Sequence, residues 1–221
     1  MDIHHLHDWN LSPTEAVQIQ KDLSDKLIDD QPLDADAVQY VAGVDVSVKD
    51  NVSQAAVVVM SYPDLELVET VKASMDTPFP YVPGLLTFRE GPVLVKAFEK
   101  LKQQPDVFIF DGMGRIHPRR MGIAAHMGLW LQRPTIGVGK THLIGDYGQP
   151  GALKGSFSWI HDRNEIIGAY LRTRSNVKPV YVSVGHLAEI NDAINFVLTC
   201  TPKYKLPRPI RLAHDAAGQM G

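Results

Sequence analysis

Cysteine is almost absent from this sequence, and so is any long apolar run. Cys200 is the one cysteine among 221 residues, so neither a disulfide framework nor a multi-cysteine zinc site can form, which favours a reducing compartment. No run reaches the ~18 apolar residues of a membrane-spanning helix. Residues 1–10 contain His and Asp where a signal peptide needs an apolar segment. These absences predict a cytoplasmic protein without a membrane partner.

An excess of positive charge, common in proteins that bind nucleic acids, is also missing. The formal net charge is −3, but the cations gather in a central region and near the C-terminal end. They are Arg115, Arg119, Arg120, Arg133 and Lys140 in the first region, and Lys203, Lys205, Arg208 and Arg211 in the second. Buried or metal-bound carboxylates add to the acidic count without making the surface acidic, so net charge decides nothing about nucleic-acid binding.

The composition is that of a globular protein, and the spacing of apolar and turn-forming residues predicts a mixed α/β domain. Hydrophobic residues make up 44% and charged residues 21% of the chain. Ser12, Pro13 and Glu15 form a helix-capping sequence that predicts a helix to about Asp29, and residues 1–11 before it are expected to be a mobile tail. The expected strands are 40–48, 54–62, 65–73, 106–110, 135–138, 155–160, 166–171 and 180–183, and the other expected helices are 87–103, 122–131 and 188–198.

The order of these elements favours one known architecture. Three β-rich segments joined by short polar turns predict an antiparallel meander. Helix, strand, helix and strand then follow in alternation. This order matches a single ribonuclease H-like domain over residues 1–221, in which helices cover both faces of a mixed sheet that begins with three antiparallel strands.

Two aspartates lie where strands of this sheet are expected. Asp45 interrupts an apolar strand (GVDVS, 43–47) and points to the face opposite Val44 and Val46. Its carboxylate is therefore either solvent-exposed on an edge strand or held in a cleft by a partner or a metal. Asp111 ends the apolar run 107–110. The carboxyl end of a central strand is where α/β sheets place ligand groups, although an Asp can also simply begin a turn.

Two further residues can join these carboxylates in one site. Glu90 lies near the start of an expected helix, where a negative charge is favourable whatever its function. His214 is a lone histidine near the C-terminus, and its role can equally be structural. If the fold brings the four residues together, they can hold one or two Mg²⁺ ions, because Mg²⁺ prefers oxygen ligands. Such ions activate water and stabilise the charge of phosphate displacement.

Two other patterns have simpler interpretations. Residues 137–141 (GVGKT) look like part of a phosphate-binding loop, but that loop requires a glycine at the position held by Pro134. His4, His5 and His7 could chelate a metal, yet they lie in the expected mobile tail. We interpret them as incidental histidines.

Six local strings, in this order, resemble the endonuclease V family. They are GVDVS (43–47), PYVPG (80–84) with FRE (88–90), DGMG (111–114) with HPRR (117–120), TIGVGK (135–140), GH (185–186) and LP (206–207). Each string alone is weak, but the ordered set is highly specific, and the resemblance extends from about residue 14 to the C-terminus. One departure is Gly139, which stands where the family pattern has alanine. A glycine makes this turn more flexible, so the exact position of Lys140 stays open.

The resemblance implies a role for each matching residue. Asp45, Asp111, Glu90 and His214 would bind Mg²⁺, for which Mn²⁺ can substitute, and Lys140 would contact the scissile phosphate or orient the attacking water. These five would be the catalytic residues. A loop of Pro80, Tyr81, Val82 and Pro83 would act as a strand-separating wedge, Gly112, Gly114, Ile123 and Leu143 would form the base pocket, and His117 and Arg119 would contact the nucleic acid.

The resemblance also implies the reaction. A monomeric enzyme would recognise deaminated or mismatched bases in DNA, chiefly inosine, and hydrolyse the second phosphodiester bond on the 3′ side of the lesion in DNA repair. The products would carry 3′-hydroxyl and 5′-phosphate ends. One alternative is an inosine-specific ribonuclease, because a few side chains suffice to read a 2′-hydroxyl. Another is a non-catalytic binder of unusual nucleic-acid structures, against which the clustered carboxylates argue, because they repel phosphate.

Overall fold

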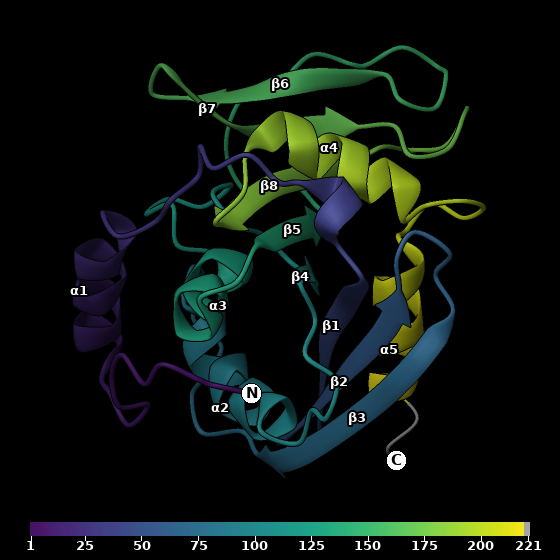
Figure 1. Cartoon of the computed structure of the whole chain (residues 1–221). Coiled ribbons are helices and arrows are strands. Elements are labelled where there is room, and N and C mark those ends of the chain that lie inside the picture. Colours follow the sequence, from purple (N-terminus) through teal and green to yellow (C-terminus); the bar gives the residue numbers. More distant parts are fainter. Residues whose placement is uncertain (219–221) are drawn as a thin grey trace.

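An eight-stranded mixed sheet runs through the molecule in the order β3-β2-β1-β4-β5-β8-β7-β6 (Figure 1). The computed structural model describes residues 1–218 of the chain. The strands are β1 (Tyr40–Lys49), β2 (Val52–Ser61), β3 (Leu67–Asp76), β4 (Val107–Asp111), β5 (Thr135–Gly139), β6 (Phe157–Asp162), β7 (Glu165–Leu171) and β8 (Val180–His186). β4 runs parallel to β1 and to β5, and the other neighbouring pairs are antiparallel. This is the mixed sheet, beginning with an antiparallel meander, that the sequence predicts.

The meander begins with a tight hairpin. Asp50 and Asn51, between β1 and β2, have φ angles of 50° and 60°, as the central residues of a type I′ turn require. Asp and Asn tolerate this backbone conformation better than other residues with side chains. The turn fixes the register of the pair, in which Asp45 lies opposite Ala56.

Helices cover both faces of the sheet, as expected. They are α1 (Pro13–Ser24), α2 (Leu86–Phe98), α3 (Ile123–Leu131), α4 (Ile190–Thr199) and α5 (Arg208–Gly218), and a short 3₁₀ helix spans Ala35–Ala37. Val44 belongs to the buried cluster under α2 and α3, whereas Val41 belongs to the cluster under α4 and α5. The alternation of side chains along β1 therefore supplies both cores.

Two helices end earlier than predicted. α1 stops at Ser24, not near Asp29. Beyond it, the N–H of Ile28 donates to Nδ1 of His186, and its carbonyl accepts from the N–H of Leu187. α2 stops at Phe98, not near residue 103. Beyond the helix, the backbone N–H groups of residues 102 and 103 donate to the carboxylate of Glu69.

The last helix, α5, has no counterpart among the predicted elements. Pro207 and Pro209 flank its first residue, Arg208, and two prolines so close together look like a break in any helix. Proline is tolerated in the first helical turn, however, because the N–H groups there have no intrahelical acceptor. The helix packs Ile210 and Ala213 into the core beneath the sheet.

The N-terminal segment, expected to be a mobile tail, packs against α3 and α2. Trp9 stacks on Trp130 with ring centroids 4.6 Å apart, the N–H of His4 donates to the carbonyl of Trp130 at 2.7 Å, and Nε2 of His7 lies 2.7 Å from Nε2 of His126. A Cβ on Gly91 would lie 2.4 Å from the Trp9 ring. The histidines of this segment therefore have packing partners within the domain.

None of the helices formed by residues 1–218 has the length and apolar character needed to cross a bilayer.

Replacing Trp9 with alanine tests whether this segment belongs to the folded domain. Trp9 is half-buried, so its truncation should reduce the free energy of unfolding by about 1–3 kcal/mol, less than the ~3–5 kcal/mol of a fully buried tryptophan. His4→Ala is the matched control, since the exposed His4 is held through its backbone N–H; its effect should stay within about 0.5 kcal/mol. Equal effects of the two variants in urea denaturation would show that the segment does not stabilise the domain.

Candidate active site

The pairing of two parallel strands sets two carboxylates side by side. β1 and β4 pair with Val44 opposite Phe110, and the next residues along the two strands are Asp45 and Asp111. Neighbouring strands lie about 4.8 Å apart, so the two side chains emerge together where the strands part. One oxygen of each carboxylate and one ring nitrogen of His214 lie within 4.8 Å of one another.

α5 supplies the imidazole of this cluster. The helix begins directly against β1, where a Cβ on Gly43 would lie 2.1 Å from the carbonyl carbon of Pro209. Only glycine permits so close an approach. Farther along the same helix, Nδ1 of His214 lies 2.7 Å from Oδ2 of Asp45. The structure thus brings His214 to the predicted site on a helix that the sequence did not predict.

The cluster concentrates negative charge in a partly buried place. Burial raises the pKa of Asp45, and repulsion by Asp111 raises it further, while the hydrogen bond from His214 and the charges of His214 and Lys140 oppose the shift. The side chains of both aspartates are only 10% exposed. A cation between the carboxylates would relieve this repulsion, and two oxygen donors with an imidazole are a suitable ligand set for a divalent metal.

Glu90 lies near this cluster but not within it. It stands on α2, partly buried, and its pKa is raised to about 8 by burial first and then by the charge of Asp45, with a smaller effect of Asp111. Its carboxylate is therefore close enough to interact electrostatically with both aspartates. The group of potential ligand atoms within 4.8 Å of one another comprises Asp45, Asp111 and His214 among the described residues.

Lys140 reaches the cluster from the third parallel strand. β5 pairs with β4 so that Val138 lies opposite Asp111, and Lys140 follows directly after β5. Its Nζ lies 2.5 Å from Oδ2 of Asp111. Gly139, the departure from the family pattern, packs against Met113, whose Cε would lie 2.3 Å from a Cβ there. The end of the Met113 side chain thus fills the space that a side chain at position 139 would occupy.

A pocket of about 400 Å³ opens beside the cluster and is shared by the predicted groups. Its lining includes Tyr81, Val82 and Pro83 of the predicted wedge, Gly112, Ile123 and Leu143 of the predicted base pocket, Asp111 of the cluster, Lys140, and His117. Tyr81 is 72% exposed at its rim, whereas Phe79, two residues earlier, is buried. The loop therefore anchors itself through Phe79 and presents Tyr81 to solvent. Pro80 is exposed and is not among the lining residues.

Gly114, Arg119 and His117 have packing contacts. Gly114 does not line the pocket: its N–H donates to Oγ of Ser183 at 2.8 Å, and a Cβ there would meet the backbone of Val184. Nε of Arg119 donates to Gln20, and Nη2 donates to the carbonyl of Gly84 at 2.9 Å. His117 lies 3.0 Å from the same carbonyl through Nε2, and burial lowers its pKa to about 4. His117 and Arg119 therefore hold the base of the loop that contains the predicted wedge.

Several contributors to this region were not predicted from the sequence. Met113, Met121 and His142 line the pocket. Gln20 of α1 ties the loop that contains the predicted wedge to the body of the domain by donating to the carbonyls of Gly84 and Met121. No local pattern distinguishes these residues from ordinary core or surface positions. Only the tertiary arrangement identifies them.

Comparisons with known proteins agree with this geometry. The family model described as Endonuclease V matches residues 21–215. The endonuclease V of Methanothrix thermoacetophila is 47% identical over 209 residues, covering 95% of this chain and 92% of the relative. That of Trichormus variabilis is 48% identical over 219 residues, covering 98% and 99%.

Solved structures show the same fold. The endonuclease V of Streptomyces avermitilis superposes with a TM-score of 0.92 at 38% identity, over 99% of this chain and 97% of that one. The endonuclease V of Ciona intestinalis, solved with a 24mer DNA containing an inosine followed by a ribo-adenosine, superposes with a TM-score of 0.80 at 28% identity, over 93% and 96% of the two chains. The ribonuclease H-like fold prediction is confirmed, and the chain belongs to the endonuclease V family of nucleases.

Proposed function

We propose that this protein is a magnesium-dependent endonuclease that recognises deaminated bases, chiefly inosine, in DNA. In this proposal it hydrolyses the second phosphodiester bond on the 3′ side of the lesion and leaves 3′-hydroxyl and 5′-phosphate ends, as a step of DNA repair. One observation carries the proposal. The cluster of Asp45, Asp111 and His214 adjoins a pocket of about 400 Å³, so a base could be held beside a group that cuts the strand.

The residues present fit a divalent metal. Asp45 and Asp111 would hold it, with His214 completing the site and Glu90 nearby, directly or through water. Two hard carboxylate oxygens favour Mg²⁺ or Mn²⁺. When bound, such an ion supplies charge stabilisation for phosphate displacement and lowers the pKa of water. The raised pKa of Glu90 supports this assignment, since a cation beside three carboxylates would favour their charged forms.

The other residues have separate tasks. Lys140 lies at Asp111 on the pocket wall, where its ammonium would contact the scissile phosphate or orient the attacking water. Tyr81 would fill the gap left by the everted base, since stacking offsets part of the few kcal/mol that eversion costs. Gly112 would let the backbone approach the flat base closely. His117 and Arg119 would hold the wedge loop in place while this occurs.

We also infer that the protein works in the cytoplasm. Cys200 is buried and free, and burial raises the pKa of its thiol, so it is a packing residue with no role in a disulfide. A domain that is stabilised without disulfides is suited to a reducing compartment.

One experiment separates this function from its alternatives. The protein is incubated with matched single-stranded DNA and RNA, each containing one inosine, first with Mg²⁺ and then with EDTA. Cleavage of DNA that stops in EDTA supports the proposal. Cleavage confined to RNA would identify an inosine-specific ribonuclease instead, and binding without cleavage of either strand would identify a non-catalytic binder.

Replacing Asp45 with asparagine should separate catalysis from stability. Cleavage should fall by several orders of magnitude, because a metal ligand is lost. The thermal midpoint without metal should stay level or rise, because the repulsion between Asp45 and Asp111 is relieved and Asn can still accept a hydrogen bond from His214. Asp50→Asn, the same change in the exposed β1–β2 turn, is the control and should change neither. An Asp45→Asn enzyme within about tenfold of wild type would exclude Asp45 as a ligand.

The exposed Tyr81 ring yields a prediction about base eversion. Tyr81→Ala should weaken binding to inosine-containing duplex by about 1–3 kcal/mol, the range for one base–aromatic stack. The loss should be smaller when the inosine is already unpaired, because less eversion energy must then be offset. Tyr81→Phe keeps the ring and should behave like wild type. Equal losses of Tyr81→Ala on both substrates in equilibrium binding would argue against a wedge.

A further inference from the structure

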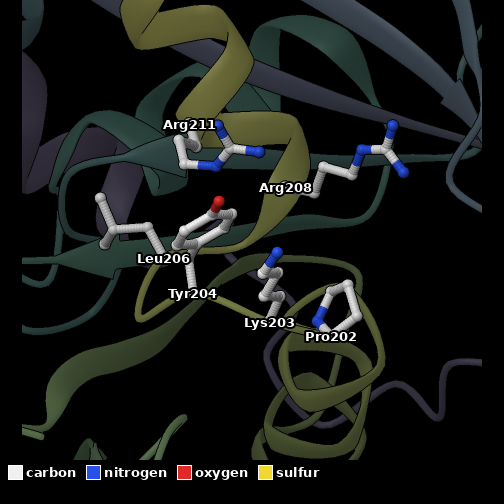
Figure 2. A pocket seen from close by; sticks show the side chains of 6 residues that line it. All are labelled: Pro202, Lys203, Tyr204, Leu206, Arg208 and Arg211. Atoms are coloured by element: carbon white, nitrogen blue, oxygen red, sulfur yellow. The ribbon is translucent and has the colours of Figure 1, made fainter.

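A second cavity, of about 250 Å³, lies where the chain enters α5 (Figure 2). It is lined by Pro202, Lys203, Tyr204, Leu206, Arg208 and Arg211. The residues come from the short segment between α4 and α5 and from the first turn of α5. The function proposed above makes no use of them.

An exposed aromatic ring with cations around it dominates this cavity. Tyr204 is 45% exposed. The guanidinium carbon of Arg211 lies 4.5 Å from the centre of its ring, and Nζ of Lys203 lies 5.5 Å from it. Figure 2 shows both cationic groups beside the ring, with Arg208 extending away from it. Nε of Arg211 is buried and has no hydrogen-bond acceptor within residues 1–218.

The positive charge of this segment is largely uncompensated. Residues 201–214 contain no Asp or Glu, and Arg211 forms one ion pair within residues 1–218, with Asp215 at 3.9 Å. Lys203 and Arg208 are exposed. The pKa of Lys205 is lowered by burial first and then by the charges of Lys178 and Lys140. Lys205 therefore lies close enough to Lys140 for their charges to interact.

The cavity also lies close to the active site along the chain. Pro209 contacts Gly43, two residues before Asp45 on β1. Arg211 precedes His214 by three residues of α5, a helical rise of about 4.5 Å. The lining of the cavity and the imidazole of the cluster therefore stand within one turn of each other on α5.

We propose that this cavity binds an unpaired nucleotide of the substrate strand, away from the phosphate that reacts. The base would lie against Tyr204 and the plane of Arg211, and the phosphates would contact Lys203 and Arg208. Exposed aromatic rings and arginine planes are the usual platforms for unpaired bases, and phosphate contacts hold the strand without reading its sequence. This inference rests on the proposed function, because it extends the same substrate strand beyond the pocket at Lys140.

Binding of fluorescent single-stranded DNA tests the proposal. Both probes carry one inosine. The long probe has about ten nucleotides on either side of it, a length within the range of site sizes of single-strand-binding proteins. The short probe has only about two nucleotides on either side. Anisotropy is measured in EDTA, so that no probe is cut. The variants are Tyr204→Ala, Tyr204→Phe and the double variant Lys203→Gln with Arg208→Gln. The charge-matched control is the double variant Lys96→Gln with Lys100→Gln. Both lysines are exposed, at the end of α2 and just beyond it, on the side of the sheet opposite to α5.

On the long probe, Tyr204→Ala should raise Kd about 5- to 100-fold, and Tyr204→Phe should stay within about twofold of wild type. The double variant should reduce the slope of log K against log salt concentration by about 1.4, or about 0.7 for each phosphate that the protein no longer neutralises. The control should leave the slope unchanged, and on the short probe all proteins should bind alike.

Two results would overturn the proposal. One is a salt dependence of the double variant equal to that of the control. The other is an equal loss for Tyr204→Ala on the long and short probes, which would mean that Tyr204 only supports the local structure. Cleavage of the long probe in Mg²⁺ tests the proposed function separately. An uncut probe whose binding still depends on Tyr204 would overturn that function while supporting the cavity as a strand-binding site.

Discussion

Two carboxylates held side by side by the pairing of β1 with β4 are the constraint on which the rest of this structure depends. Asp45 and Asp111 repel each other in a partly buried place, and the cost of burying unpaired charge is high. The fold offsets it from two directions, with a hydrogen bond from His214 on α5 and the ammonium of Lys140 after β5. Gly43 is part of the same arrangement, since it lets α5 lie close enough to β1 for His214 to reach Asp45.

The two carboxylates and the exposed Tyr81 stand on adjacent but distinct supports. The carboxylates stand on sheet strands, which are rigid, whereas Tyr81 stands on a proline-rich loop. That loop is fixed at Gly84, whose carbonyl accepts hydrogen bonds from the side chains of Gln20, His117 and Arg119. Gly112 connects the two parts, because it follows Asp111 directly and lines the pocket. In the proposed function, a change in the loop would therefore alter base recognition while leaving the carboxylates in place.

Much of this arrangement could be predicted from the sequence, because strand periodicity and turn residues are local. The meander and the position of Asp111 at the end of a buried strand follow from such patterns, whereas the role expected for Tyr81 came from the family resemblance alone. The rest depended on tertiary contacts. Prolines at the start of α5 looked like a helix break, and only packing against β1 shows that they begin a helix. The roles of Arg119 and Gly114 in packing, and the contacts of Trp9 with α3, have no local signal at all.

Magnesium binding to the protein without nucleic acid tests the two-carboxylate site most directly. Calorimetric titration of Mg²⁺ into wild type should give saturable binding. Asp111→Asn should weaken it by more than the roughly 10–100-fold typical of losing a group that only supports a ligand. Asp50→Asn, in the exposed turn of the same sheet, should bind as wild type does. Equal Mg²⁺ affinities of wild type and Asp111→Asn would contradict the assignment of this carboxylate pair as the metal site.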